Sequence, residues 1–207
     1  MKSVTIVDHP LLDDSLARMR NQLTAPDEFR RAVAEATTLV VCEATRELAQ
    51  KTVRVTTPLA PAKGKVLKHP VLLVPVLRAG LGMLDAALKL LPHAQVGMIG
   101  LARDERTLLP AAYKESLPDR LGAYEVLVLD PMLATGGSAV AACARLFKRG
   151  AKRVRLLHLL AAPEGVSHVQ SEYPQVPIVV GALDRRLNAQ GYIVPGLGDA
   201  GDRQFGV

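Results

Sequence analysis

Glu125-Val-Leu-Val-Leu-Asp130-Pro-Met-Leu-Ala-Thr-Gly-Gly-Ser138 is the stretch of sequence that decides the fold of this chain. Its first six residues form an apolar run that ends in an acid, which predicts a buried strand. A helical pattern begins directly after the final serine. A strand, a glycine-rich turn and a helix in direct succession are typical of α/β proteins with a parallel sheet.

Short apolar runs on both sides of this stretch predict further strands. They occupy residues 71–77, 96–101, 154–160 and 178–183. Helical patterns fill two of the gaps, at residues 81–91 and 138–149. Apolar strands that alternate with helices predict an α/β fold with a mostly parallel central sheet flanked by helices. In such sheets ligands bind beyond the carboxyl ends of the strands.

The first third of the chain reads as helical. Apolar residues recur at three- and four-residue steps from Leu12 to Leu23, and Pro26 starts a second helical pattern that runs toward Leu48. Residues 56–64 carry turn chemistry and predict a connecting segment. The length of 207 residues fits one domain over residues 1–207, and the 49% of hydrophobic residues suffice for a sizeable core.

The composition limits which kinds of binding partner and which cellular compartment are expected. The formal charge of +6 suits an anionic ligand, while scattered basic residues and only 3% aromatics argue against nucleic-acid binding. Residues 71–77 are too few to cross a membrane, which takes roughly 20 residues, and the N-terminus has no signal-peptide pattern. Cys42 and Cys143 are expected to be buried free thiols, which favours the cytoplasm.

The loop after the decisive strand carries groups that suit a sugar phosphate. Gly136 and Gly137 let backbone N–H groups approach an anion, and the following helix adds its own unpaired N–H groups. Thr135 and Ser138 supply hydroxyl donors. Asp130 can accept hydrogen bonds from vicinal sugar hydroxyls, so the loop predicts a ribose 5-phosphate site. The alternative is a plain strand-to-helix turn with Ser138 as the N-cap.

The sequence resembles the type I phosphoribosyltransferases, and among them the uracil phosphoribosyltransferase family, over nearly the whole chain. The matching segments are the loop just described, Pro75-Val-Leu-Arg-Ala-Gly-Leu-Gly-Met83, Ala102-Arg-Asp-Glu105 and Gly191-Tyr-Ile-Val-Pro-Gly-Leu-Gly-Asp-Ala-Gly-Asp-Arg203. The resemblance implies the type I phosphoribosyltransferase fold with a C-terminal base-binding hood. It also implies transfer of the ribose 5-phosphate of phosphoribosyl diphosphate (PRPP) to uracil, which gives UMP and diphosphate. Mg²⁺ would accompany the PRPP, with no direct side-chain ligation of the metal.

The resemblance assigns residues to each substrate. The PRPP site comprises Arg78, Arg103, Asp130, Pro131, Met132, Leu133, Ala134, Thr135, Gly136, Gly137, Ser138 and Asp199. The uracil site comprises Ile193, Gly198, Asp199 and Ala200. The catalytic roles fall to Asp130, Asp199 and Arg103. On pattern alone, each arginine is a surface residue that follows a predicted strand, and Asp199 caps its own turn.

Several further expectations remain. Residues 103–121 suit an active-site lid or a plain solvated hairpin. The resemblance implies a homodimer or larger homo-oligomer, and GTP activates some relatives. Arg106 and Arg185-Arg186 depart from the residues common in the family, which bears on surface charge and any effector response. Two alternatives stay open: a phosphoribosyltransferase for another base, and an RNA-binding regulator built on the same fold.

Overall fold

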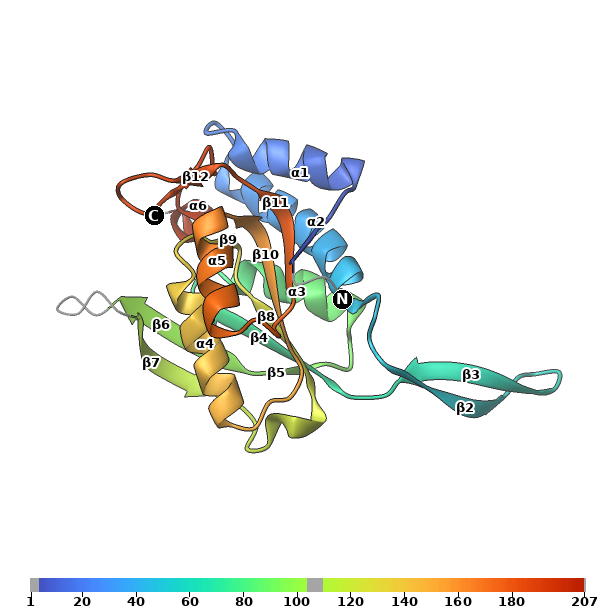
Figure 1. Ribbon diagram of the computed structural model, residues 1–207. Coiled ribbons are helices and arrows are strands. Elements are labelled where there is room, and N and C mark those ends of the chain that lie inside the picture. The colour runs from blue at the N-terminus through green and yellow to red at the C-terminus, as the bar shows by residue number, and fades with distance from the viewer. Residues whose placement is uncertain (1–3, 104–109, 207) are drawn as a thin grey trace.

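A mostly parallel sheet forms the centre of the computed structural model, which describes residues 4–103 and 110–206 (Figure 1). Its strands lie in the order β1 (Val4–Ile6), β11 (Ile178–Leu183), β10 (Val154–Ala161), β8 (Glu125–Leu129), β4 (Val71–Leu77), β6 (Met98–Arg103) and β7 (Pro110–Ser116). Among these strands only β6 and β7 pair antiparallel. The predicted α/β architecture is confirmed.

The sheet is buried on both faces, which explains why its strands are apolar runs. Leu127 and Leu129 of β8 belong to one core, whereas Val126 and Val128 belong to the other, because successive side chains point to opposite faces. The first core is covered by α1 (Pro10–Arg20), α2 (Pro26–Thr45) and α3 (Leu81–Leu90). The second is covered by α4 (Gly137–Lys148) and α5 (Pro163–Glu172), which stand in front of the sheet in Figure 1.

Two of the predicted elements differ from the structure. The strand expected at residues 96–101 is divided at Gly97 into β5 (Gln95–Val96) and β6, both in the same register against β4. The segment expected to be a connection, residues 56–64, is part of an antiparallel hairpin formed by β2 (Gln50–Thr56) and β3 (Pro61–Leu67). That prediction was wrong because both faces of the hairpin are largely exposed, so its sequence lacks the apolar alternation of a half-buried strand.

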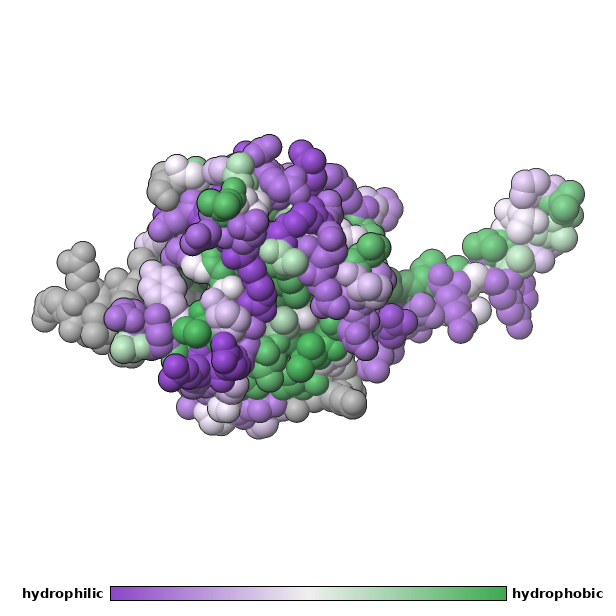
Figure 2. Space-filling view, turned by 90° about the horizontal axis from the view of Figure 1, so that it is seen from above, coloured by the Kyte–Doolittle hydropathy of each residue, from purple (hydrophilic) through white to green (hydrophobic). Residues whose placement is uncertain are grey.

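The β2–β3 hairpin extends away from the body as an arm (Figures 1 and 2). Hydrophobic side chains lie along it and at its tip, and Leu59 is 97% exposed. The two strands of the arm, β2 and β3, therefore do not pack into the hydrophobic core of the body.

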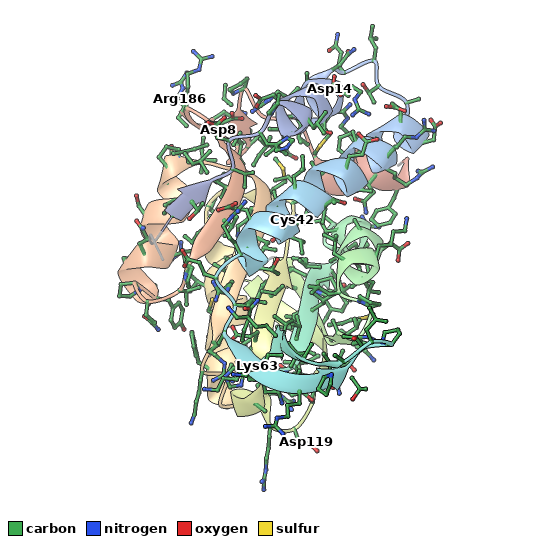
Figure 3. The ribbon with its side chains drawn as sticks, turned by 90° about the vertical axis from the view of Figure 1, so that its right-hand side faces the viewer. Asp8, Asp14, Cys42, Lys63, Asp119 and Arg186 are labelled. Carbon is green, nitrogen blue, oxygen red and sulfur yellow. The ribbon has the colours of Figure 1, made fainter. Side chains whose placement is uncertain are left out.

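The prediction that both cysteines are buried free thiols was right for Cys143 and wrong for Cys42. Cys143 is buried in α4, and burial raises the pKa of its thiol to about 12. Cys42 is a free and exposed thiol on α2 (Figure 3), so its predicted burial was wrong. The buried stripe of α2 includes Phe29, Val33 and Val40, and a residue two positions after Val40 points to the opposite side of a helix.

The last elements of the chain lie over the carboxyl edge of the sheet. They are β12 (Arg186–Leu187), β13 (Ile193–Val194) and α6 (Ala200–Phe205). Residues 184–206, here called the hood, lie where a C-terminal hood was expected. No helix in the ranges 4–103 and 110–206 is long and apolar enough to cross a membrane. The assignment of residues 1–207 to one domain stays a prediction.

Candidate active site

The loop between β8 and α4 has the backbone shape that its glycines predict. Gly136 is the N-cap of α4 and has a φ of 83°, in the left-handed region that favours glycine. Ser138 lies within the first turn of α4, so the alternative in which it caps the helix is wrong. The first turn of a helix has unpaired N–H groups, and Ser138 lines the small cavity at this end of α4.

Helix α5 supports this loop from behind, a contribution that the sequence pattern did not predict. A Cβ added at Gly165 would lie 2.4 Å from the carbonyl oxygen of Ala134. His168 places Nδ1 2.8 Å from the carbonyl oxygen of Thr135, and since a carbonyl only accepts, Nδ1–H donates. The available signal was small: Pro163 begins a helix directly after β10, and a glycine follows in its first turn.

Asp130 follows β8 and sits half-buried beneath the loop. Its Oδ1 accepts a long hydrogen bond of 3.4 Å from the backbone N–H of Met132, and burial raises the pKa of its carboxyl to about 7. His158 donates from Nδ1 to the Asp130 carbonyl oxygen at 2.7 Å. Burial lowers the pKa of His158 to about 4, so the ring that holds the Asp130 backbone is neutral near pH 7.

Two adjoining cavities meet at this aspartate. The smaller, of about 70 Å³, is lined by loop residues from Asp130 to Ala139. The larger, of about 220 Å³, is lined by Ala79 and by residues of the hood from Gly191 to Gly201. Asp130, Met132 and Ala134 line both cavities. The arrangement thus offers an anion cradle and a wider cavity on either side of one carboxyl group.

The hood brings the predicted base-site residues to the larger cavity. Ile193, Gly198, Asp199 and Ala200 all line it. Asp199 also caps α6, since its Oδ1 accepts from the backbone N–H of Gly201 at 2.8 Å and of Asp202 at 3.0 Å. The capping alternative for Asp199 is therefore real, and it coexists with a place in the cavity wall.

The remaining predicted residues contribute in different ways. Pro131 and Leu133 are buried, and their carbonyl oxygens accept from the β10 backbone and from Ala162. Arg78 directly follows β4 and is exposed, with its guanidinium carbon 5.8 Å from the centre of the Phe205 ring. Arg103 is the last residue of β6, the neighbour of β4, and its side chain lies outside the described residues.

The departure at Arg106 and part of the predicted lid, residues 103–121, fall on residues 104–109, which lie outside the described ranges. Residues 110–116 on the far side form β7, which pairs antiparallel with β6. The hairpin is therefore observed, and the lid function of residues 103–121 stays a prediction.

Metal binding by protein side chains alone has no candidate in the described part of the chain. There, no group of three or more His, Cys, Asp or Glu side chains is arranged to hold a metal ion.

Comparison with known proteins places the chain in a family. It matches the uracil phosphoribosyltransferase family over residues 6–207. It is 52% identical over 208 residues to the uracil phosphoribosyltransferase of Bacillus licheniformis and 51% identical over 208 residues to that of Shouchella clausii, with 100% of each chain covered. A solved protein from Aquifex aeolicus is 37% identical, with a TM-score of 0.93 over 99% of this chain and 98% of its own. A hypoxanthine-guanine phosphoribosyltransferase from Bacillus anthracis, only 12% identical, shares the fold with a TM-score of 0.52 over 77% of this chain and 80% of its own. The chain belongs to the uracil phosphoribosyltransferase family.

Proposed function

We propose that the protein transfers the ribose 5-phosphate group of PRPP to uracil and forms UMP and diphosphate. The observation that carries this proposal is the pair of adjoining cavities that share Asp130. A nucleotide has a phosphate at one end, a base at the other and a sugar diol between them. The two cavities and the carboxyl group between them match that order.

The smaller cavity suits the 5-phosphate. The N–H groups at the start of α4, the left-handed turn at Gly136 and the hydroxyls of Thr135 and Ser138 all favour an anion there. Asp130 would accept hydrogen bonds from the ribose hydroxyls. Arg78 follows β4 and Arg103 ends the neighbouring strand β6, and we assign both to the diphosphate because a guanidinium binds phosphate oxygens in bidentate fashion.

The residues present fit Mg²⁺ that arrives with PRPP. The pKa of the Asp130 carboxyl is raised to about 7 by burial, and a nearby cation would favour its ionised form. Bound Mg²⁺ would neutralise charge on the departing diphosphate. The chain's own part is to orient the ribose with Asp130, to hold the phosphate on the loop and to keep water from the larger cavity.

The larger cavity suits a pyrimidine base read by the backbone. Uracil offers a donor at N3 and an acceptor at O4, and cytosine reverses this pattern. Backbone groups of Ile193 and of residues 198–200 would satisfy uracil, whereas cytosine would leave buried polar groups unpaired. This pairing distinguishes the proposal from a phosphoribosyltransferase for another base.

A panel of bases tests the proposal. The purified protein is incubated with PRPP and Mg²⁺ and, separately, with uracil, cytosine, adenine, guanine, hypoxanthine and orotate. UMP from uracil alone, absent without Mg²⁺ and strongly reduced in Asp130→Asn, is the expected result. Asp85→Asn is the control, because Asp85 is an exposed aspartate on α3 that lines neither of the two cavities. If no base yields a nucleotide, the proposed activity is wrong. Binding of RNA would then be measured, because the alternative is an RNA-binding regulator built on the same fold.

The resemblance also supports a homo-oligomer and GTP as an effector, and the free cysteines support a cytoplasmic location; all three stay predictions. Light scattering of the purified protein would measure the oligomeric state, and rates of UMP formation with and without GTP would measure the effector response. A single monomer mass would contradict the homo-oligomer.

A further inference from the structure

An ion pair between Arg20 and Asp184 holds one residue of the hood, Gly196, by both its backbone N–H and its carbonyl oxygen. Arg20, the last residue of α1, donates from Nη2 to Asp184 Oδ1 at 2.7 Å and from Nη1 to Asp184 Oδ2 at 2.8 Å. Asp184 Oδ2 also accepts from the N–H of Gly196 at 2.8 Å, and Arg20 Nη1 donates to the carbonyl oxygen of Gly196 at 3.0 Å. The pair therefore binds both the donor and the acceptor of this residue.

The gripped residue has little freedom of its own. Gly196 has a φ of 61°, and a Cβ added to it would lie 2.1 Å from the carbonyl oxygen of Ile193. Ile193 itself lines the larger cavity. The position of Gly196 thus sets the position of the backbone that would read the base.

A second arginine fixes the next residue of the same segment. Arg203 donates from Nη1 to the carbonyl oxygen of Leu197 at 2.9 Å and also to that of Met19. Its Nη2 donates to the carbonyl oxygen of Asn21 at 2.7 Å, and its guanidinium carbon lies 4.4 Å from the centre of the Phe29 ring. Both arginines thus tie the hood to the C-terminal end of α1.

We propose that Arg20 and Asp184 are positioning residues that set the affinity and selectivity of the enzyme for its base. The inference rests on the proposed function and adds to it residues that do not touch the substrates. The Asp184 side chain is 6% exposed and that of Arg20 is 27% exposed, and the two side chains pair through both guanidinium nitrogens and both carboxylate oxygens, which defines the geometry of the contact. The phosphate loop, which would hold the 5-phosphate of PRPP, is held by α5 instead, so loss of the pair should spare that part of the PRPP site.

Kinetics of Arg20→Gln and Asp184→Asn test the inference. Each change breaks the ion pair whose two side chains hold the N–H and the carbonyl oxygen of Gly196, so the hood segment should move. We expect the KM for uracil to rise at least ~10-fold while the KM for PRPP stays within about twofold. Turnover of cytosine relative to uracil should increase. The double variant should resemble either single variant, because the two residues act as one unit.

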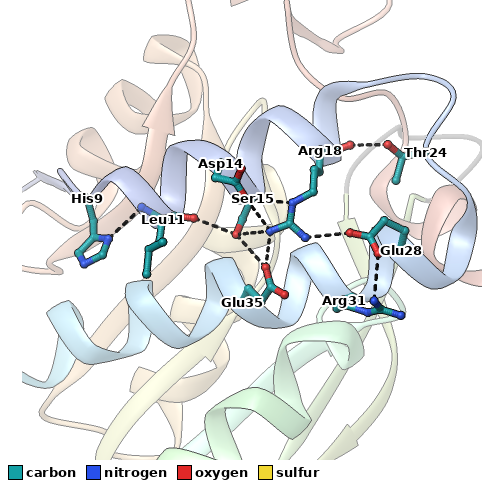
Figure 4. A network of polar contacts seen from close by, with 9 residues as sticks. All are labelled: His9, Leu11, Asp14, Ser15, Arg18, Thr24, Glu28, Arg31 and Glu35. Carbon is teal, nitrogen blue, oxygen red and sulfur yellow. Dashed lines mark hydrogen bonds and ion pairs between the residues drawn. The ribbon is translucent and has the colours of Figure 1, made fainter.

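Arg18→Gln is the matched control on the same helix. Arg18 also forms several ion pairs, one with Asp14 within α1 and two with Glu28 and Glu35 of α2, and none of these partners belongs to the hood (Figure 4). Its loss should leave both KM values unchanged. Arg20→Lys provides a milder variant if Arg20→Gln folds poorly, since lysine keeps the charge but cannot make both contacts of the guanidinium fork. It should raise the uracil KM by a smaller factor.

Hydrogen exchange of residues 188–200 separates failure of the inference from failure of the proposed function. Faster exchange in Arg20→Gln and Asp184→Asn, but not in Arg18→Gln, is expected even if the protein makes no UMP. If the wild type makes UMP and both hood variants keep the wild-type uracil KM and exchange rates, the inference is wrong and the function stands. Equal increases in both KM values would also overturn it, because they would indicate general loss of structure.

Discussion

The phosphate loop and the hood meet at the same aspartate, but they are held in place by different means. The loop of residues 130–138 is held by close backbone contacts, such as that between Gly165 and Ala134, and by the helix that follows it. The hood of residues 184–206 is held by arginine side chains that come from the other end of the chain or reach back to it. A local sequence pattern thus builds the first region, and long-range ion pairs position the second.

The largest effect is expected where the loop relies on backbone shape. Gly136→Ala places a Cβ 2.8 Å from the carbonyl oxygen of Gly165 at a residue whose φ is 83°. The loop must move, so its N–H groups lose their common direction. We expect kcat/KM for PRPP to fall at least ~100-fold, as measured by initial rates of UMP formation.

Gly150→Ala is the control for backbone strain. Gly150 follows α4 and has a φ of 79°, but a Cβ there would meet nothing within 4 Å. Both variants therefore carry a similar conformational cost of about 1 kcal/mol, and only one disturbs the loop. Equal activities of the two variants would show that the close contact with α5 is unimportant.

Asp130 lies where the loop and the hood meet, and its substitution tests whether its carboxyl group serves activity at the expense of stability. Burial raises the pKa of its carboxyl to about 7, above the ordinary value of 3.8, so the folded state favours the neutral acid. Its contribution to stability is complete below pH 3.8 and is lost as the pH rises toward 7. Asparagine does not ionise. Asp130→Asn should therefore be more stable than the wild type at pH 8 by up to about 4 kcal/mol, which is a rise of several degrees in Tm, while its activity falls at least ~10-fold.

Thermal unfolding at pH 8 and at pH 4 measures this difference without substrates. The stabilisation should be present at the higher pH and absent at the lower one. If Asp130→Asn is inactive but has the same stability as the wild type at both pH 8 and pH 4, the carboxyl group of Asp130 must be in contact with water, contrary to its half-buried position.

The contrast between the two regions also explains what the sequence could predict. The strand, the paired glycines and the start of α4 lie within fourteen consecutive residues, so their chemistry can be recognised from the sequence alone. Arg20 and Asp184 are 164 residues apart, and nothing in the sequence near either residue indicates the contact. The support that α5 gives to the loop was missed for the same reason. The resemblance supplied the hood residues, whereas periodicity alone would not have found them.

The exposed arm and Cys42 show a second limit of periodicity. Both faces of the arm are largely exposed, so no alternation of apolar and polar residues marks its strands. Cys42 stands beside Val41 and near Val40, which are buried, and only its angle around the helix directs it outward. Apolar residues recur at the period of a helix or strand only where one face of that element is buried. A segment with few buried side chains therefore carries no such pattern in its sequence.

Asp199 gives the smallest expected effect and the finest test of the comparison, because it caps a helix of the hood and also lines the larger cavity. Asp199→Ala removes the cap, which costs about 1 kcal/mol of stability, and it also removes the carboxylate. Asp199→Asn keeps a good capping oxygen and removes only the charge. If the charge positions the substrates, both variants should lose about tenfold in kcat/KM, and only Asp199→Ala should lose stability.

Steady-state kinetics and thermal unfolding of the two variants separate these roles. Wild-type activity of Asp199→Asn, with reduced activity and stability of Asp199→Ala, would make Asp199 a helix cap that acts only through the shape of the hood. The hood would then recognise its base entirely through a backbone held from outside by arginines. Reduced activity of Asp199→Asn at full stability would instead give the hood a carboxylate of its own at the cavity, facing the same space as Asp130.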